Sequence, residues 1–242
     1  MSDSSAGQRP GHDAADEDAA RVQAEYARRA QDDALRRYYE HSRSAIEEAS
    51  VERRTLTLEF VDRLGPRDAS AVLDVGCGIG GDLAYLAGHG FAAERLSGID
   101  LLAERVVAAR TSVPGADLRV GNAAQLPHPD ASFDVVLQSV VLSSVTDASV
   151  RAMIAGEMAR VARPGGLLIS YDMRTLGSAN PQLTKIDEPE VRRLFGAFGQ
   201  IEIRTLTLNI GMARRVGPIA ARVLRRLPPL RTHLLAVVTR RP

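Results

Sequence analysis

Cysteine is nearly absent from the sequence, because Cys77 is the only one in 242 residues. A single cysteine forms no intrachain disulfide, and a zinc site built of four cysteines is excluded. No run of about 18 apolar residues is present that could span a membrane. Met1 is followed by small and polar residues rather than by the apolar segment of a secretory signal. We therefore expect a cytoplasmic protein with no bound metal and no stable membrane insertion.

Net charge is also low, because 31 Lys and Arg residues face 30 Asp and Glu residues, which gives +1. This balance does not indicate a nucleic-acid binder. No acidic residue follows Glu202, although nine arginines do. Within this basic region, residues 212–227 place apolar side chains at helical spacing and arginines on the other face. Three interpretations stay open: a helix packed on the rest of the protein, a lid over an anionic substrate, or a helix resting on an anionic membrane surface.

The distribution of glycine, proline and apolar residues predicts an N-terminal appendage followed by an α/β domain. Residues 1–18 are small and polar, which favours a disordered tail. Residues 19–66 are rich in helix-forming side chains and end at a Gly-Pro pair, so we expect an N-terminal helical cap with helices over 19–50 and 51–64. From residue 67 to residue 242, short apolar runs alternate with helical segments, which is typical of a mostly parallel sheet.

The α/β region contains seven expected strands, at 71–75, 96–102, 117–120, 133–142, 166–171, 201–208 and 233–239. Helices are expected at 82–90, 103–110, 148–161 and 188–195. This order predicts a Rossmann-like, doubly wound, seven-stranded sheet with helices on both of its faces.

A glycine-rich turn follows the first expected strand, with Gly76, Gly78, Gly80 and Gly81 in six residues. Glycine tolerates positive φ and leaves space where a side chain would block a ligand. Ligands of open α/β sheets bind beyond the carboxyl ends of the strands, so this turn predicts a nucleotide-like ligand.

The carboxylates near this turn indicate which ligand it binds. Asp74 lies two residues before the first glycine, where it would repel a pyrophosphate, and no Gly-Lys-Ser/Thr sequence of a P-loop is present. S-adenosylmethionine, which carries an ammonium and a sulfonium group but no phosphate, fits this charge better than NAD does. Asp100 ends the second expected strand and can accept hydrogen bonds from ribose hydroxyls; a helix N-cap is the alternative role for this residue.

These motifs resemble those of class I S-adenosylmethionine-dependent methyltransferases of the type-11 kind. Residues 72–82 resemble the first motif and residues 98–101 the second. Residues 121–123 with 126–127 and 132–134 resemble the adenine loop and fourth strand, and residues 163–166 resemble the turn before the fifth strand. The resemblance covers about residues 70–175.

The resemblance implies cofactor roles residue by residue. Asp74, Gly76 and Gly78 would line the methionine end directly or through water, and Gln138 would lie near the same end. Asp100 would bind the ribose, Leu101 would pack on the adenine, and Asn122 and Ala123 would contact the adenine edge. Cys77 belongs to the same loop as a small apolar filler without a catalytic role. These residues form the expected cofactor site: Asp74, Gly76, Cys77, Gly78, Asp100, Leu101, Asn122, Ala123 and Gln138.

Two positions depart from the family pattern. Asn122 stands where many relatives carry aspartate, and its amide oxygen remains an acceptor for the adenine amino group. His128 stands where an aromatic residue is frequent, so stacking on the adenine is less favoured. We expect His128 near the adenine rather than near the methyl acceptor.

Candidate residues for the methyl acceptor come from three segments. Tyr171, Asp172 and Arg174 follow the fifth strand, Ser143 and Ser144 follow the fourth, and Tyr38, Tyr39 and His41 lie in the N-terminal cap. We select His41 and Asp172 as candidate catalytic residues, because an imidazole or a carboxylate could act as general base. The alternatives are a surface histidine and an Asp172–Arg174 ion pair. His233, at the start of the last strand, is interpreted as structural.

The expected function is transfer of a methyl group from S-adenosylmethionine to a small-molecule acceptor, with O-methylation of a natural product or a sugar-containing metabolite favoured. No Asn/Asp-Pro-Pro-Tyr signature of nucleic-acid amino-group methylation follows the fourth strand, where residues 138–141 read Gln-Ser-Val-Val. Methylation at nitrogen or carbon, and a lipid-linked or phosphorylated substrate, stay open as alternatives. A non-catalytic cofactor-binding module and a NAD-dependent oxidoreductase are less favoured.

Overall fold

The structure, a computed structural model, describes residues 10–176, 181–208, 216, 220, 223–224 and 227–242. Its helices are α1 (Pro10–Ala30), α2 (Asp33–His41), α3 (Arg43–Val61), α4 (Gly81–Ala87), α5 (Ala103–Ser112), α6 (Ala148–Val161) and α7 (Glu188–Phe195). Its strands are β1 (Val72–Val75), β2 (Leu96–Asp100), β3 (Asp117–Val120), β4 (Phe133–Ser139), β5 (Ala162–Met173), β6 (Gly199–Leu208) and β7 (Arg231–Arg240). The basic stretch 212–227 lies almost entirely outside the described residues.

The sheet confirms the predicted α/β fold. Its strand order is β3-β2-β1-β4-β5-β7-β6, with β1 to β5 parallel and β7 antiparallel to both of its neighbours. The order reverses between β1 and β4, and such a switch point opens a crevice at the carboxyl ends of the strands. The glycine turn after β1 is therefore placed at the crevice by topology alone.

Two apolar cores lie on opposite faces of the sheet. On one face, α6 and α7 pack on alternate strand residues such as Leu73 and Leu234. On the other face, α3, α4 and α5 pack on the intervening residues such as Val72 and Leu235. This alternation is what a strand buried on both faces requires, because successive side chains point to opposite sides.

The N-terminal helices differ from the prediction. Residues 10–18, expected in a disordered tail, form the first turns of α1, and proline suits the first helical position because its missing N–H has no partner there. Ala15 and Asp18 are buried by packing on the domain. The single helix expected over 19–50 is interrupted before α2, where the Asp32 side chain accepts from Leu35 N at 2.9 Å and starts a new helix, and again at Ser42.

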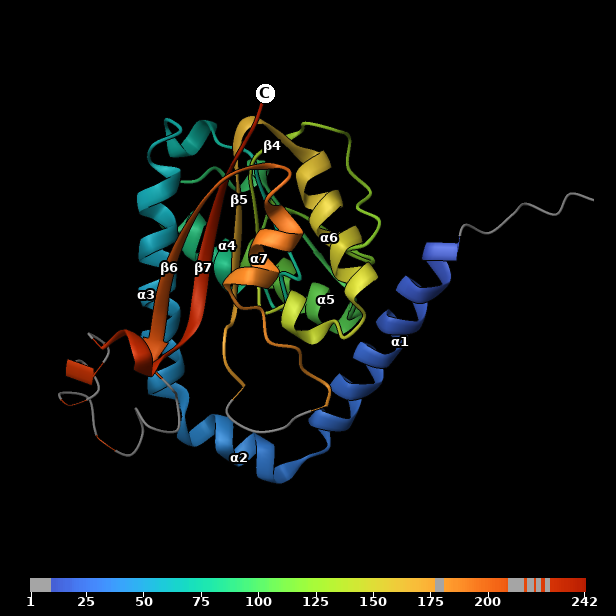
Figure 1. The fold of residues 1–242 in the computed structure, drawn as a ribbon, viewed down its shortest axis with the longest axis vertical. Coiled ribbons are helices and arrows are strands. Elements are labelled where there is room, and N and C mark those ends of the chain that lie inside the picture. Colours follow the sequence, from blue (N-terminus) through green and yellow to red (C-terminus); the bar gives the residue numbers. More distant parts are fainter. Residues whose placement is uncertain (1–9, 177–180, 209–215, 217–219, 221–222, 225–226) are drawn as a thin grey trace, which may run out of the picture.

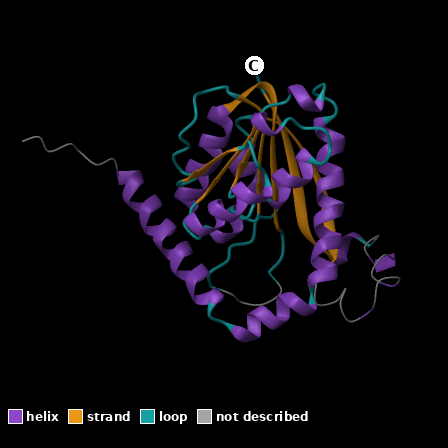
Figure 2. Cartoon of the chain, turned by 180° about the vertical axis from the view of Figure 1, so that it is seen from behind, coloured by secondary structure: helices purple, strands orange, loops and turns teal. Residues whose placement is uncertain are grey.

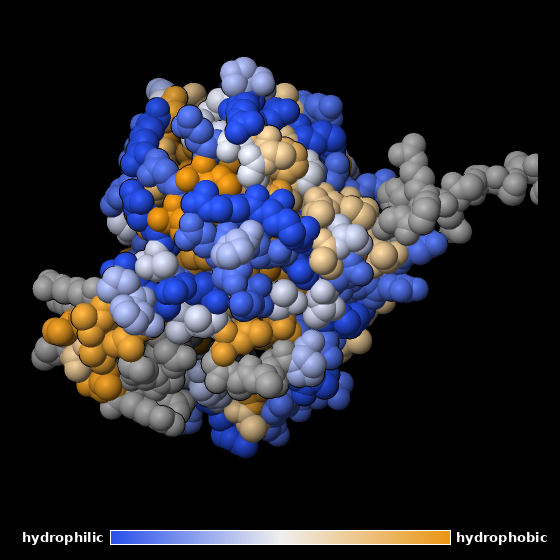
Figure 3. Space-filling model, in the orientation of Figure 1, coloured by the Kyte–Doolittle hydropathy of each residue, from blue (hydrophilic) through white to orange (hydrophobic). Residues whose placement is uncertain are grey.

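These three helices surround the carboxyl end of the sheet. In Figure 1, α1 and α3 lie on either side of the domain and α2 crosses below it, on the side to which the segment after β5 descends. Figure 2 shows the same arrangement from behind. Hydrophobic residues are visible on the surface at this lower end of the molecule (Figure 3). Within the described residues, no helix combines the length and apolar character needed to cross a membrane.

Candidate functional site

The glycine turn is held in a conformation that side chains disfavour. Gly76, Gly78 and Gly80 have φ values of 76°, 54° and 81°, all in the left-handed region. A Cβ on Gly76 would lie 2.2 Å from Cγ2 of Val141, so this position also lacks room. The Gly76 amide donates to the Ile99 carbonyl at 2.7 Å, which ties the turn to β2. The turn therefore brings bare backbone to the crevice.

Asp100 connects this turn to the next helix. Its Oδ2 accepts from the Gly78 amide and its Oδ1 from the Leu102 amide, each at 2.9 Å. The carboxylate is buried yet borders a cavity. Each carboxylate oxygen has a further lone pair, so Asp100 can accept hydrogen bonds from a ribose while it fixes the two loops.

A cavity of about 530 Å³ opens at the carboxyl ends of the strands. This volume lies in the range of small-molecule sites, roughly 300–1,000 Å³. Five of the predicted cofactor residues lie on its wall: Gly76, Asp100, Leu101, Asn122 and Ala123. Gly78 and Cys77 do not reach the wall. The Cys77 side chain packs on Gly98 of β2 instead, and burial raises the pKa of its thiol, so it stays protonated.

Asp74 lies beneath the turn, on the face of the sheet that carries α3 and α4. It is 2% exposed, and within the described residues no hydrogen bond to its carboxylate is found. Burial, followed by the negative charge of Asp82, raises the pKa of Asp74 well above its ordinary value. The positive charge of Arg53 partly offsets this shift, and Asp74 does not reach the cavity wall. The fit to S-adenosylmethionine is carried instead by Asp100 and Asn122 on the wall, whose oxygens can accept from a ribose and from an adenine amino group.

Asn122 connects the adenine loop to the N-terminal cap. Its Oδ1 accepts from the Ala124 amide at 2.9 Å, and its Nδ2 donates to the Ala15 carbonyl of α1 at 3.2 Å. One lone pair of the amide oxygen stays available for a ligand.

Helix α1 closes the cavity from outside through hydrogen bonds to three loops. The Asp18 carboxylate accepts from Thr146 N at 3.3 Å and Oγ1 at 3.2 Å. Arg21 donates to the Ser144 carbonyl at 2.5 Å and Gln23 to the Leu101 carbonyl at 3.2 Å. These contacts join α1 to the loops after β2, β3 and β4, which all border the cavity.

Gln138 is not on the cavity wall, contrary to the prediction that it lies by the methionine end. It is 1% exposed, and its Nε2 donates to Ser170 Oγ at 2.6 Å and Asp172 Oδ2 at 2.5 Å. Its Oε1 accepts from the Val141 amide at 2.9 Å. Gln138 thus sets the position of Val141, which contacts Gly76 and lines the cavity.

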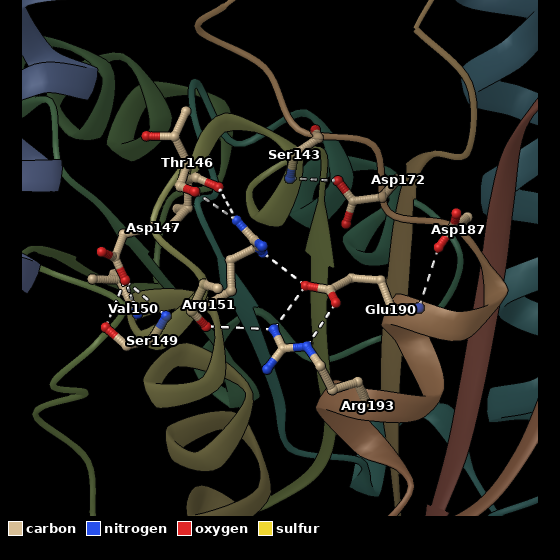
Figure 4. Close-up of polar contacts among 12 residues, drawn as sticks. Ser143, Thr146, Asp147, Ser149, Val150, Arg151, Asp172, Asp187, Glu190 and Arg193 are labelled. Atoms are coloured by element: carbon tan, nitrogen blue, oxygen red, sulfur yellow. Dashed lines mark hydrogen bonds and ion pairs between the residues drawn. The ribbon is translucent and has the colours of Figure 1, made fainter.

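Asp172 does not reach the cavity wall either, so its catalytic role stays a prediction without support from the geometry. Its carboxylate is fully buried and accepts from Gln138 and, at 3.0 Å, from the Ser143 amide (Figure 4). Burial raises the pKa of Asp172 to about 6. The alternative ion pair with Arg174 is also absent from the described residues, because Arg174 donates to the carbonyls of Pro228 and Arg231.

The other acceptor-side candidates separate into two groups. His41 is exposed at the end of α2 with Nδ1 2.6 Å from the Arg37 carbonyl, and it lies off the cavity wall, so its role as general base stays a prediction. Tyr38 and Ser143 are also off the wall, whereas Tyr39 and Ser144 lie on it.

Two arginines that the sequence analysis missed fix α3 to the start of α4. Arg53 binds the Asp82 carboxylate through both terminal nitrogens, at 2.6 and 2.7 Å, and Arg54 Nε binds it at 2.8 Å. Although burial opposes ionisation, Arg53 holds the pKa of Asp82 below its ordinary value. No local pattern marks these arginines, because their partner lies about thirty residues away.

A second polar network fixes α6 against α7. Arg151 is buried, donates to Glu190 at 2.9 Å and also donates to the carbonyls of Val145 and Thr146 (Figure 4). Arg193, followed by Arg151, lowers the pKa of Glu190 to about 2 although burial opposes this. The network positions residues 145–146, which α1 contacts from the other side.

His128 lies off the cavity wall, so its place near the adenine stays a prediction. It is 7% exposed, packs edge-on against Phe133 at 5.2 Å, and neither ring nitrogen has a partner among the described residues. A buried polar group without a partner costs about 1–3 kcal/mol. We therefore expect His128→Phe to raise the free energy of unfolding by about 1 kcal/mol in urea denaturation. A His128→Phe protein that is less stable than the parent would show that the imidazole has a favourable partner.

Comparison with known proteins agrees with this geometry. Residues 73–170 match the model of a family described as "Methyltransferase domain". The chain carries a class I S-adenosylmethionine-dependent methyltransferase domain. S-adenosylmethionine is the cofactor of this domain, and the matched segment runs from β1 through β5, which contains every cofactor residue on the cavity wall.

Individual relatives span several methylation chemistries. The chain is 34% identical over 151 residues to 2-methyl-6-phytyl-1,4-hydroquinone methyltransferase of Synechocystis. The matched region covers 59% of this chain and 45% of that protein. It is 37% identical over 109 residues to fatty-acid O-methyltransferase of Mycolicibacterium smegmatis, covering 44% and 38%. Other relatives are named as C- and N-methyltransferases. The chain spans less than half the length of the first curated relatives it matches.

Solved structures confirm the fold. The structure of geranyl diphosphate C-methyltransferase from Streptomyces coelicolor, in complex with Mg²⁺, geranyl diphosphate and S-adenosyl-L-homocysteine, matches with a TM-score of 0.58 at 18% identity. The match covers 77% of each chain.

Proposed function

We propose that the protein transfers the methyl group of S-adenosylmethionine to an oxygen of a small, largely apolar molecule such as a natural product. One observation carries the proposal: a single cavity joins the cofactor residues on β1, β2 and β3 to a wall on the opposite side of the switch point. That wall is formed mainly by apolar and aromatic residues, namely Tyr39, Ile46, Val140, Val145, Met173 and Leu183. This wall favours an apolar scaffold over a free sugar.

The chain contributes mainly position and water exclusion. The cofactor supplies a methyl group on a sulfonium, whose leaving group is already good. Alignment of an acceptor with such a methyl group contributes roughly 7–11 kcal/mol to catalysis, so a strong base is unnecessary for an acidic hydroxyl. Asp100 fixes the ribose and α1 covers the cavity, and both restrict the two reactants to one geometry.

The backbone beside the acceptor wall is strained. Val140 has φ of 63°, which is unfavourable for a β-branched residue. Its amide donates to the Tyr171 carbonyl at 2.8 Å, and its carbonyl accepts from the hydroxyls of Ser143 and Ser144. Such over-determined strain clusters at functional sites, and here it sets the direction of Val140 and Val141 toward the cavity.

Methyl transfer is tested with isotopically labelled S-adenosylmethionine and a metabolite extract. We expect labelled products that are small molecules with the methyl group on oxygen, as identified by mass spectrometry and NMR. Label on nitrogen or carbon would reject the O-directed part alone. Label found only in RNA, DNA or protein would reject the small-molecule assignment, and binding of NAD but not of S-adenosylhomocysteine would reject the methyltransferase.

Cofactor binding should release a proton from Asp74. In the free protein, burial and the negative charge of Asp82 raise the pKa of this carboxyl, so it keeps its proton to a higher pH than a free aspartate does. A bound ammonium favours the carboxylate, so affinity for S-adenosylhomocysteine should rise with pH as Asp74 ionises. Calorimetry in two buffers of different ionisation enthalpy should detect the release, and Asp74→Asn should abolish it. Equal proton release by the two proteins would show that Asp74 does not sense the ligand.

A further inference from the structure

His233 lies at the end of the sheet where the acceptor would bind. It is the third residue of β7, and in the antiparallel register it pairs with Met173, the last residue of β5, and with Leu206 of β6. Met173 and His233 both line the cavity. The start of β7 therefore reaches the same edge as the carboxyl ends of the parallel strands.

The imidazole ring has a fixed plane. It stacks on the Tyr171 ring with centroids 5.0 Å apart and 7° between the planes. The Tyr171 hydroxyl is 2.7 Å from Thr207 Oγ1, and the Arg53 guanidinium lies 5.2 Å from the Tyr171 ring centroid. Residues of α3, β5 and β6 thus hold the ring on which His233 rests.

Thr232 lies where its hydroxyl can select which nitrogen of His233 carries the proton. Thr232 Oγ1 is 3.2 Å from the Thr207 carbonyl and 3.0 Å from His233 Nδ1. A carbonyl only accepts, so a Thr232 hydroxyl that donates to Thr207 accepts from Nδ1–H of the imidazole. In this tautomer Nε2 carries a free lone pair.

Thr207 is itself held in a strained conformation. Its φ is 63°, and it is skipped in the pairing of β6 with β7, which passes from Leu206–His233 to Leu208–Arg231. The Glu52 carboxylate of α3 accepts from the Thr207 amide at 3.1 Å and helps hold it there. In this conformation the Thr207 carbonyl points at Thr232. Strained backbone conformations of this kind are retained mainly at functional sites.

Burial, with the positive charge of Arg53, keeps the imidazole neutral. Burial and then the positive charge of Arg53 lower the pKa of His233 to about 4. Tyr171, which lies between them, is also un-ionised, because burial raises its pKa to about 12. At neutral pH His233 is therefore an uncharged hydrogen-bond acceptor, and among the described residues no donor to Nε2 is found.

We propose that His233 Nε2 recognises a hydroxyl group of the methyl acceptor, in a subsite completed by Tyr39, Ile46, Met173 and Leu183. This rests on the proposed function and narrows its substrate class to neutral apolar molecules that carry an O–H donor. A carboxylate or phosphate offers no proton to the lone pair, so the subsite excludes anionic groups at this point. A site built around a buried polar atom discriminates strongly against a ligand that leaves it unpaired.

The test compares 1-naphthol with 1-methoxynaphthalene as probes of protein saturated with S-adenosylhomocysteine. The two probes share the apolar ring, and only the naphthol has an O–H. We expect the naphthol to bind about tenfold more tightly, which corresponds to one hydrogen bond of about 1 kcal/mol or slightly more. His233→Phe keeps the ring stack on Tyr171, so the preference should fall to about one while methoxynaphthalene still binds.

Two further variants serve as controls. His233→Gln places an amide oxygen near the position of Nε2 and should restore part of the naphthol preference. His89→Phe makes the same change at an exposed histidine that stacks on Tyr85, and it should alter neither affinity. No binding of either probe, equal affinities in the parent protein, or an unchanged preference in His233→Phe would overturn the proposal.

Nitrogen NMR of the imidazole gives a readout that does not depend on turnover. We expect Nδ1 to be protonated and Nε2 to be unprotonated, with the Nε2 resonance shifting when naphthol is added. The opposite tautomer would overturn the subsite even if methyl transfer is demonstrated. Absence of S-adenosylhomocysteine binding would instead reject the proposed function, so the two failures are distinguishable.

Discussion

Replacement of Asp100 with alanine should weaken S-adenosylhomocysteine binding by about a hundredfold or more. The carboxylate is the group on the cavity wall that can accept from both ribose hydroxyls, and a hydrogen bond to a charged group contributes about 1.5–3 kcal/mol. Two such bonds correspond to roughly two orders of magnitude in Kd. The variant also frees the amides of Gly78 and Leu102, which loosens the glycine turn and the start of α5.

A matched control separates ligand contact from loop support. Asp134 on β4 also accepts a backbone hydrogen bond, from the Ala71 amide at 2.8 Å, and it pairs with Arg163 at 2.7 Å. It lies at the opposite end of the strand from the cavity, because Phe133 begins β4. Asp134→Ala should lower stability and leave affinity unchanged. Calorimetry that shows equal affinities for Asp100→Ala and the parent would remove Asp100 from the cofactor site.

The features that the sequence predicted well are determined locally. Short apolar runs and the glycines after them are sufficient to place β1 and the turn at residues 76–81. A buried parallel strand selects apolar residues, and a positive φ selects glycine. Asp100 follows from the same logic, since its place at the end of β2 fixes its edge of the sheet. These are the cofactor residues that the cavity brings together.

The site residues that were predicted less well depend on a different property, which is the face of the sheet to which a side chain at a strand end points. Gln138 and Asp172 were expected at the site, but their neighbours Ser139 and Met173 line the cavity instead. Successive strand residues point to opposite faces of the sheet. A prediction that is wrong by one residue along the strand therefore selects a buried side chain instead of the one that lines the cavity. The pairing of Gln138 with Ser170 across β4 and β5 decides the facing, and single-strand patterns do not contain it.

His233 and α1 were missed for a related reason. His233 takes its place from Tyr171, on which it stacks, and from Arg53 beside that ring, and these residues lie on two other elements. Residues 10–18 have a composition typical of disorder, yet α1 is stabilised by contacts with the adenine loop and with Thr146. Tertiary contacts override local propensity in both cases.

Gly76→Ala should be the most damaging single methyl addition in the cofactor site. A left-handed φ costs a non-glycine residue about 1–2 kcal/mol, and the overlap with Val141 adds about 1–3 kcal/mol. We therefore expect the free energy of unfolding to fall by about 2–5 kcal/mol, together with a loss of S-adenosylhomocysteine affinity as the turn shifts. Gly78→Ala has the same φ penalty but no atom within 4 Å of its new Cβ. Its destabilisation should stay at about 1–2 kcal/mol.

The double variant Gly76→Ala/Val141→Ala provides the decisive comparison. Removal of the Val141 Cγ atoms clears the overlap, because the remaining Val141 Cβ lies 3.6 Å from the new methyl, an ordinary contact. The double variant should therefore be more stable than the sum of the two single effects implies, with a favourable coupling of at least about 1 kcal/mol in urea denaturation. Strict additivity would mean that φ alone dictates glycine at residue 76 and that Val141 does not close on the turn. Gln138 would then not position the glycine turn through its hydrogen bond to the Val141 amide.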